Sequence, residues 1–389
     1  MTTTEAAPES VTDALSRFRG DMPVKPPNAR SLAATIENPG CNARRVFDAA
    51  GVDIRVVSER IGAPMPEEQS VFALNRGTRF EKDLKEDGYA RLLELLREHG
   101  FKVHAPVVLP LRSMYPIGPR NADEMLRKRA DATRDAVLRM AGGDDSAPNL
   151  IDGGALQWDF GGATARLETD GIAWRLGGRI RIIEIKSFPI VDGRGDPGKV
   201  GAAAWQAAVY VSAISEMLAA AGYDGGVLSS EILLICPKNT SLVPTLAPVD
   251  VSRQARALRR LLNGRKQVPE ILAALGDDLT LNTDGMDEAT AASRLADVLE
   301  RLGTNYLPSC LASCPLAYHC RNRARSAGDP ACVGPEVRSS LAGITSIPRV
   351  LELTSGSPAT AEEAAAAEVL ERASRLLRAV ETGALRGAA

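Results

Sequence analysis

The sequence predicts an α/β protein in which a mixed β-sheet is flanked by helices. Short stretches of apolar and β-branched residues alternate with glycine-rich turns, which is typical of a meander of neighbouring antiparallel strands. A long alanine-rich helix is expected at 199–221, and two further strands follow it at 231–236 and 242–247. The expected strands of the meander are Asn149–Ile151, Leu156–Phe160, Thr164–Leu167, Ile172–Leu176 and Ile180–Ile185.

The segments before this sheet are expected to be largely helical. Residues 1–29 are rich in Thr, Ala, Glu and Pro, and we interpret them as a flexible arm with a short helix at Val11–Phe18. Residues 30–100 are expected to form an N-terminal helical part, with helices over Cys41–Ala50 and Thr78–His99. Gly88, in the middle of Thr78–His99, disfavours one unbroken helix over that stretch.

The rest of the chain divides into three further regions. Residues 101–250 are expected to hold the sheet, with an additional strand at 101–110 and a helical insertion near 111–150 that could determine partner or substrate specificity. Residues 251–335 are expected to be helical, beginning with a basic helix at 251–264 and ending in a cysteine cluster. Residues 336–389 are a tail with one amphipathic helix at about 360–383.

Composition sets limits on function. The chain has 389 residues, 44% hydrophobic and 25% charged, which is ordinary for a globular protein of one elaborated domain or a few. Its net charge of −2 gives no global sign of a polyanionic partner, so any nucleic-acid site must be a local basic patch. The acidic N-terminus does not resemble a signal peptide, and the apolar run 200–221 contains Gln206 and Glu216. We therefore expect a cytoplasmic protein without a membrane partner.

Glu184 and Lys186 end an isoleucine-rich strand. Residues i and i+2 of a strand project from the same face, so the two charged side chains are expected to lie together while Ile185 points away. Charged residues are rarely buried unless they are paired or bind a ligand. One interpretation is an edge strand with a solvated face, and the other is a functional site.

Asp170 lies in a turn just before the expected hairpin partner of this strand. A hairpin that begins near Asp170 and ends at Glu184 would return both carboxylates, and Lys186, to one edge of the sheet. Two carboxylates and the backbone carbonyl of Ile185 form an oxygen-rich site that suits Mg²⁺ or Mn²⁺. A neighbouring lysine could orient an attacking water and offset charge on phosphorus, as phosphodiester hydrolysis requires.

Asp170, followed after 13 residues by Glu184-Ile185-Lys186, resembles the PD-(D/E)XK nuclease superfamily, whose core is the restriction-endonuclease-like sheet. Gln206 and Tyr210 have the spacing of a pair that the RecB-like branch carries after this strand. The segment 77–81 resembles the first motif of that branch, in which Glu81 would join the metal ligands. From the residues alone, Glu81 could also form a surface pair with Lys85, and Gln206 and Tyr210 could be satisfied buried polar groups.

Clustered cysteines in a cytosolic chain indicate metal or redox chemistry. Cys310, Cys314 and Cys320, with Cys41 far upstream, resemble the [4Fe–4S] ligands of CRISPR-associated RecB-like exonucleases and AddB-type nucleases. The family spacing is C-x2-C-x5-C, whereas three residues separate Cys310 from Cys314, so Cys332 is an alternative to Cys310. Zinc on the same four thiolates is the alternative cofactor.

The resemblance implies a Mg²⁺- or Mn²⁺-dependent deoxyribonuclease with a C-terminal iron–sulfur cap, acting on single-stranded DNA or duplex ends in DNA repair, CRISPR adaptation or antiviral defence. It also implies that Lys186 assists the attacking water and that Gln206 and Tyr210 position the substrate. The chain has no Gly-Lys phosphate-binding loop, so a helicase or other motor would be a separate partner. The alternative is a non-catalytic DNA-binding or scaffold subunit that retains the fold.

Overall fold

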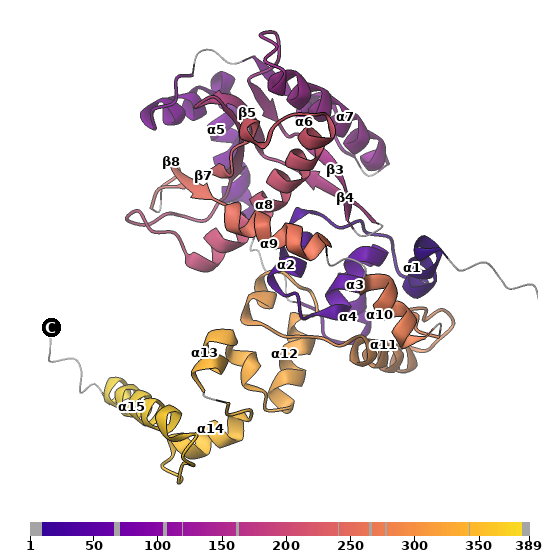
Figure 1. The fold of residues 1–389 in the computed structure, drawn as a ribbon, viewed down its shortest axis with the longest axis vertical. Helices are drawn as coiled ribbons and strands as arrows, with labels where there is room; N and C mark the ends of the chain where they lie inside the picture. The colour runs from indigo at the N-terminus through magenta and orange to yellow at the C-terminus, as the bar shows by residue number, and fades with distance from the viewer. Residues whose placement is uncertain are drawn as a thin grey trace, which may run out of the picture.

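The computed structural model describes residues 10–65, 71–103, 107–118, 120–160, 163–239, 241–263, 267–276, 278–341 and 343–382. Within these ranges, six strands form one mixed sheet in the order β1-β2-β5-β6-β7-β8, with helices on both faces (Figure 1). The predicted α/β class is therefore confirmed. The strands of this sheet are β1 Val108–Pro110, β2 Leu150–Asp152, β5 Gly171–Leu176, β6 Arg179–Ile185, β7 Glu231–Pro237 and β8 Pro244–Asp250.

Strand β6 lies in the middle of the sheet and pairs differently on its two sides. It is antiparallel to β5, through the two-residue turn Gly177-Gly178, whose positive φ angles of 66° and 79° favour glycine. It is parallel to β7, because helix α8 (Pro197–Ala220) connects the two strands. The carboxyl end of β6 is therefore flanked by the start of β5 and by the middle of β7.

The predicted meander is wrong in one respect. Strands β3 (Ala155–Phe160) and β4 (Ala163–Glu168) pair only with each other, while β2 pairs directly with β5. The reason is the apolar face of this hairpin: Leu156, Trp158 and Leu167 are buried in the same core as the helices α7 and α8. The hairpin therefore packs on the helices rather than extending the sheet.

The two faces of the sheet are covered by different helices. Alternate residues of β6 face opposite cores: Ile180 and Ile182 pack with α8, while Ile183 packs with α5 (Val71–Glu98). Each fully buried isoleucine contributes roughly 1.5–3 kcal/mol. Helix α5 is broken at 86–89, where Asp87, Gly88 and Tyr89 have positive φ, in line with the weak point expected at Gly88.

A second, helical core lies beside the sheet and includes the N-terminus. Helix α1 (Val11–Arg19) buries Leu15 and Phe18, and the ring of Phe18 lies 6.0 Å from that of Phe47, between centroids. The expectation of a flexible arm is thus corrected for residues 10–29. The apolar residues of α1 share one helical face, and this face packs on α3 (Asn42–Ala50) rather than facing solvent.

The remaining helices complete these cores or extend from them. The C-terminal helices α14 (Ile347–Thr354) and α15 (Ala364–Glu381) share a small core of their own and project from the rest of the chain (Figure 1). The others are α2 Ala29–Glu37, α4 Ile54–Arg60, α6 Leu111–Met114, α7 Ala122–Ala141, η1 Gly225–Val227, α9 Ser252–Asn263, α10 Gln267–Leu275, α11 Glu288–Leu302, η2 Pro308–Ala312, α12 Ala317–Ser326, η3 Pro330–Val333 and α13 Pro335–Ser340.

Candidate functional site

The carboxyl end of β6 carries a buried acid and a lysine on one face, as its strand periodicity predicts. Glu184 is 1% exposed, and its Oε1 lies 2.5 Å from Nζ of Lys186, which is 25% exposed. Neither carboxylate oxygen of Glu184 has a hydrogen bond of normal geometry among the described residues. The ammonium of Lys186 compensates this buried charge in part, but Oε2 of Glu184 has no partner among the described residues, which is costly unless a further cation binds it.

Asp170 is brought to Glu184 by the hairpin. It lies in the turn before β5, and its Oδ2 accepts a hydrogen bond of 2.8 Å from the amide of Ile185. The register pairs Gly171 with Ile183, so the start of β5 and the end of β6 meet at one edge. The predicted proximity of Asp170, Glu184 and Lys186 agrees with this geometry.

Burial and the charges of neighbouring groups shift the pKa values of Glu184, Asp170 and Lys186. Burial raises the pKa of Glu184 to about 7; the charge of Lys186 opposes this shift, and that of Asp170 adds to it. Burial also raises the pKa of Asp170. Burial alone would lower the pKa of Lys186, but Glu184 and Asp170 outweigh it and raise that pKa. The site thus concentrates negative charge that favours a bound cation.

Glu81 lies near these groups but is bound to cations of the protein. Its Oε1 is 2.6 Å from Nζ of Lys85 and 2.6 Å from Nη1 of Arg112. Burial would raise the pKa of Glu81, but these two ion pairs hold it below its usual value. The described residues include no group of three or more His, Cys, Asp or Glu side chains arranged to hold a metal ion. Glu81 would have to exchange partners to join Asp170 and Glu184 as a ligand.

Sequence reasoning missed three residues of this site, Arg112, Asp152 and Tyr89. Arg112, 43% exposed, reaches both Glu81 and Asp170, since its Nη2 lies 3.9 Å from Oδ1 of Asp170. Asp152, at the end of β2, accepts hydrogen bonds from Lys85 at 2.6 Å and from the hydroxyl of Tyr89 at 2.9 Å. The position of Asp152 at a strand end on the same sheet edge was the available signal.

Gln206 and Tyr210 lie behind Lys186 on α8. Nζ of Lys186 donates to Oε1 of Gln206 at 3.0 Å, and Nε2 of Gln206 donates to the hydroxyl of Tyr210 at 2.8 Å. Tyr210 is 2% exposed, so it contacts Gln206 rather than anything at the surface. The i, i+4 spacing thus places the pair as a hydrogen-bonded support that orients the lysine.

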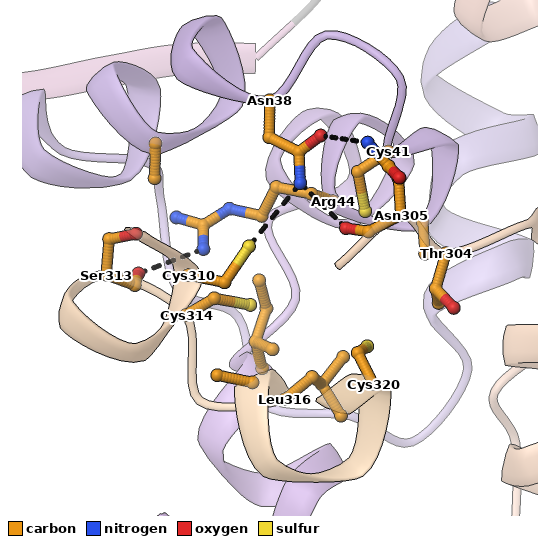
Figure 2. A pocket seen from close by; sticks show the side chains of 14 residues that line it. Asn38, Cys41, Arg44, Thr304, Asn305, Cys310, Ser313, Cys314, Leu316 and Cys320 are labelled. Atoms are coloured by element: carbon orange, nitrogen blue, oxygen red, sulfur yellow. Dashed lines mark hydrogen bonds between the residues drawn. The ribbon is translucent and has the colours of Figure 1, made fainter. Parts of the chain in front are cut away.

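The four cysteines Cys41, Cys310, Cys314 and Cys320 line one cavity of about 20 Å³, and Figure 2 shows their side chains around it. Cys41 caps the start of α3, whereas the others come from η2, the following turn and α12. All four are free thiols. The fold therefore joins residues more than 250 positions apart, as the resemblance implies.

Four thiols are the donor set of zinc and iron–sulfur sites, but in this conformation they are not arranged to hold a metal ion, and the cavity has room for only about one water molecule. Nδ2 of Asn38 donates to Sγ of Cys310 at 3.4 Å, a contact of the kind that polarises a thiolate ligand. Burial raises the pKa of Cys41 and Cys310, and that of Cys320 to about 12. Metal binding would therefore release protons. Cys332 lies in η3 and does not line the cavity.

Arg44 secures the wall of this cavity. It is fully buried and forms an ion pair with Asp48, Nε to Oδ2 2.9 Å. Its Nη1 also donates to the carbonyl of Ser313 at 3.2 Å, and Nη2 donates to that of Ser31 at 3.1 Å. One guanidinium thus ties the cysteine loop to α2 and α3.

No protein-family model matches the chain, and the search of curated proteins gives no match. Among solved structures, the chain is similar to a crystal structure of SSO0001, at 15% identity over 62% of this chain and 95% of that one, with a TM-score of 0.20. A similarity this low carries no argument. Within the described residues, no helix is both long and apolar enough to cross a membrane.

Proposed function

We propose that the protein is a Mg²⁺- or Mn²⁺-dependent deoxyribonuclease of the PD-(D/E)XK type. The observation that carries this proposal is the buried Glu184, whose carboxylate lacks normal hydrogen bonds and lies beside Asp170 and Lys186. Structural charges of this kind are normally satisfied, and strongly shifted carboxylates gather at functional sites. The restriction-endonuclease-like core is part of the same proposal.

Each residue has a distinct role in this proposal. Asp170, Glu184 and the carbonyl of Ile185 would hold the metal, with Glu81 joining them after release by Lys85 and Arg112. A divalent ion bound there would supply Lewis-acid polarisation of the phosphate. The ammonium of Lys186 orients the attacking water and offsets charge on the phosphate, leaving a 5′-phosphate product. Gln206 and Tyr210 are positioning residues, because Gln206 contacts Lys186 and Tyr210 contacts Gln206.

We further propose that Cys41, Cys310, Cys314 and Cys320 hold a [4Fe–4S] cluster, with zinc as the alternative. Four thiols from both ends of the chain, gathered at one cavity, support this. The group would act as a structural link between α3 and the C-terminal cap. Anaerobic purification tests it: a brown protein with broad visible absorbance is expected, and a colourless protein containing zinc would contradict the cluster.

The substrate we propose is single-stranded DNA or a duplex end. The assay uses purified protein, Mn²⁺, and single-stranded, blunt duplex and circular DNA. Asp170→Ala should lower the cleavage rate by about 10³, whereas the matched surface variant Lys128→Ala, exposed on α7, should retain it. If Asp170→Ala cleaves as well as the parent, the assignment is wrong.

A non-catalytic DNA-binding or scaffold subunit is the second candidate. The ion pairs that Glu81 makes with Lys85 and Arg112 favour it, because they occupy a carboxylate that the nuclease would offer to the metal. A parent protein that binds DNA but cleaves none of the substrates in Mn²⁺ or Mg²⁺ would favour this function. Partners such as a separate helicase or a CRISPR or defence protein suit either candidate.

A further inference from the structure

A second cavity, of about 250 Å³, lies beside the cysteine site. Its lining includes the extended segment 25–28 with the start of α2, and the cysteine loop 312–315. The start of α4 also lines the cavity. Arg44, Ser313 and Cys314 line both this cavity and the cysteine cavity, so the two share a wall.

The side chains around this cavity carry an excess of positive charge. Its described lining includes the cations Lys25, Arg30, Arg44 and Arg55, and the carboxylates Asp48 and Asp53. Both carboxylates are already engaged. Asp48 binds Arg44 and the hydroxyl of Thr35, and Asp53 binds Lys25 at 3.0 Å and caps α4 through the amide of Arg55.

Arg55 is the cation best placed to take a ligand. Its side chain is exposed, and within the described ranges it forms no ion pair or side-chain hydrogen bond. Arginine donors match the geometry of phosphate oxygens and can bind them in a bidentate manner. An exposed arginine at the edge of a polar cavity is therefore suited to an anion with several oxygens.

Arg30 connects this cavity to the carboxylate site. Its Nη2 donates to the carbonyl of Ala312 at 2.6 Å, on the cysteine-loop wall. Arg30 lies on α2, which packs against α8, the helix whose Gln206 contacts Lys186. Helix α2 thus joins the wall of this cavity to the helix that supports Lys186.

We infer that this cavity binds a phosphate group of a single nucleic-acid strand, adjacent to the segment of the strand that lies at Asp170 and Glu184. The inference rests on the proposed nuclease function, which it extends to a second contact point on the strand. The volume is below the ~300 Å³ of the smallest typical small-molecule pockets, which suits a phosphate and part of its sugar rather than a whole cofactor.

The test measures binding of a fluorescein-labelled oligothymidylate by anisotropy in EDTA, where no cleavage occurs, over a series of NaCl concentrations. Arg55→Ala should weaken binding about two- to fivefold, and Arg55→Glu should weaken it more. The plot of log K against log salt should become less steep, with its slope smaller in magnitude by about 0.7, the value for one lost phosphate contact on a single strand. Arg372→Glu, an exposed arginine on α15, is the matched control and should bind like the parent.

The inference is overturned if Arg55→Glu binds the oligothymidylate as tightly as the parent and with the same salt slope, or if the parent does not bind the oligothymidylate. It is also overturned if Arg55→Glu abolishes the binding of inorganic phosphate but leaves the binding of the oligonucleotide unchanged. Far-ultraviolet circular dichroism checks that the exposed substitutions leave the fold intact. Failure of the nuclease function would be distinct, because it would appear as unchanged cleavage by Asp170→Ala.

Discussion

The carboxylate site at the end of β6 and the cysteine site are assembled in different ways. Asp170 and Glu184 are 14 positions apart and are joined by one hairpin register. Cys41 and Cys310 are joined only when the helical core has formed, because no local element links them. The first site concentrates negative charge within the sheet, whereas the second gathers neutral thiols between packed helices. We therefore expect the first site to cost stability and the second, when filled, to add to it.

The largest expected effect concerns the chemistry of the first site. Lys186→Ala removes the ammonium that lies beside Glu184 but leaves both acids, so cleavage should fall by about 10³ while Mn²⁺ still binds. Single-turnover cleavage and Mn²⁺ titration measure the two effects separately. Retained cleavage would show that Lys186 is only a charge partner of Glu184.

The second expected effect concerns stability at the cysteine site. Cys41→Ala should abolish the visible absorbance of the purified protein and lower its unfolding free energy by about 4 kcal/mol, as expected for loss of a ligand far above its dissociation constant. Cys332→Ala is the matched control, because Cys332 does not line the cavity. If Cys332→Ala loses the absorbance and Cys310→Ala keeps it, the ligand set must be revised.

The third expected effect is a gain in stability rather than a loss. In EDTA, Glu184→Gln should raise the unfolding free energy at pH 8 by roughly 3 kcal/mol, because the variant removes a buried carboxylate with a raised pKa. Since the folded pKa of about 7 exceeds the unfolded value near 4.5, the native state holds the extra proton. The parent should therefore lose stability as pH rises from 4.5 to 7, and Glu184→Gln should lose less. Thermal unfolding at several pH values measures this, and parallel curves would contradict it.

The smallest expected effect concerns the support of Lys186. Tyr210→Phe removes only the hydroxyl that binds Gln206, so cleavage should fall about fivefold, equivalent to ~1 kcal/mol for one hydrogen bond. Gln206→Ala should cost more, because it also removes the acceptor of Lys186. A change in KM with constant kcat for Tyr210→Phe would indicate substrate contact rather than lysine positioning.

Sequence patterns identified the residues that contact each other within one strand, one hairpin or one helix. The period of two placed Glu184 with Lys186, the hairpin placed Asp170 near them, and the i, i+4 spacing placed Gln206 with Tyr210. Arg112 could not be found in this way, since its contact with Glu81 arises from the packing of α5 and α6. Asp152 was signalled only by its place at the end of a strand, and its contact with Lys85 also depends on packing.

Two predictions from the sequence fail for the same physical reason. The β3–β4 hairpin has a strand pattern, but its apolar face packs on α7 and α8 instead of joining the sheet. The N-terminal segment has a disordered composition overall, but Leu15 and Phe18 are enough to bury α1. In both cases tertiary packing decided what composition and periodicity left open.

Mn²⁺ binding to the metal-free protein tests the central claim most directly, because it needs no substrate. Isothermal titration of the EDTA-treated and dialysed parent should show saturable Mn²⁺ binding, and Glu184→Gln, which removes the charge but keeps the side-chain volume, should abolish it. Equal Mn²⁺ binding by the parent and Glu184→Gln, or no binding by either protein, would contradict a metal site at the end of β6.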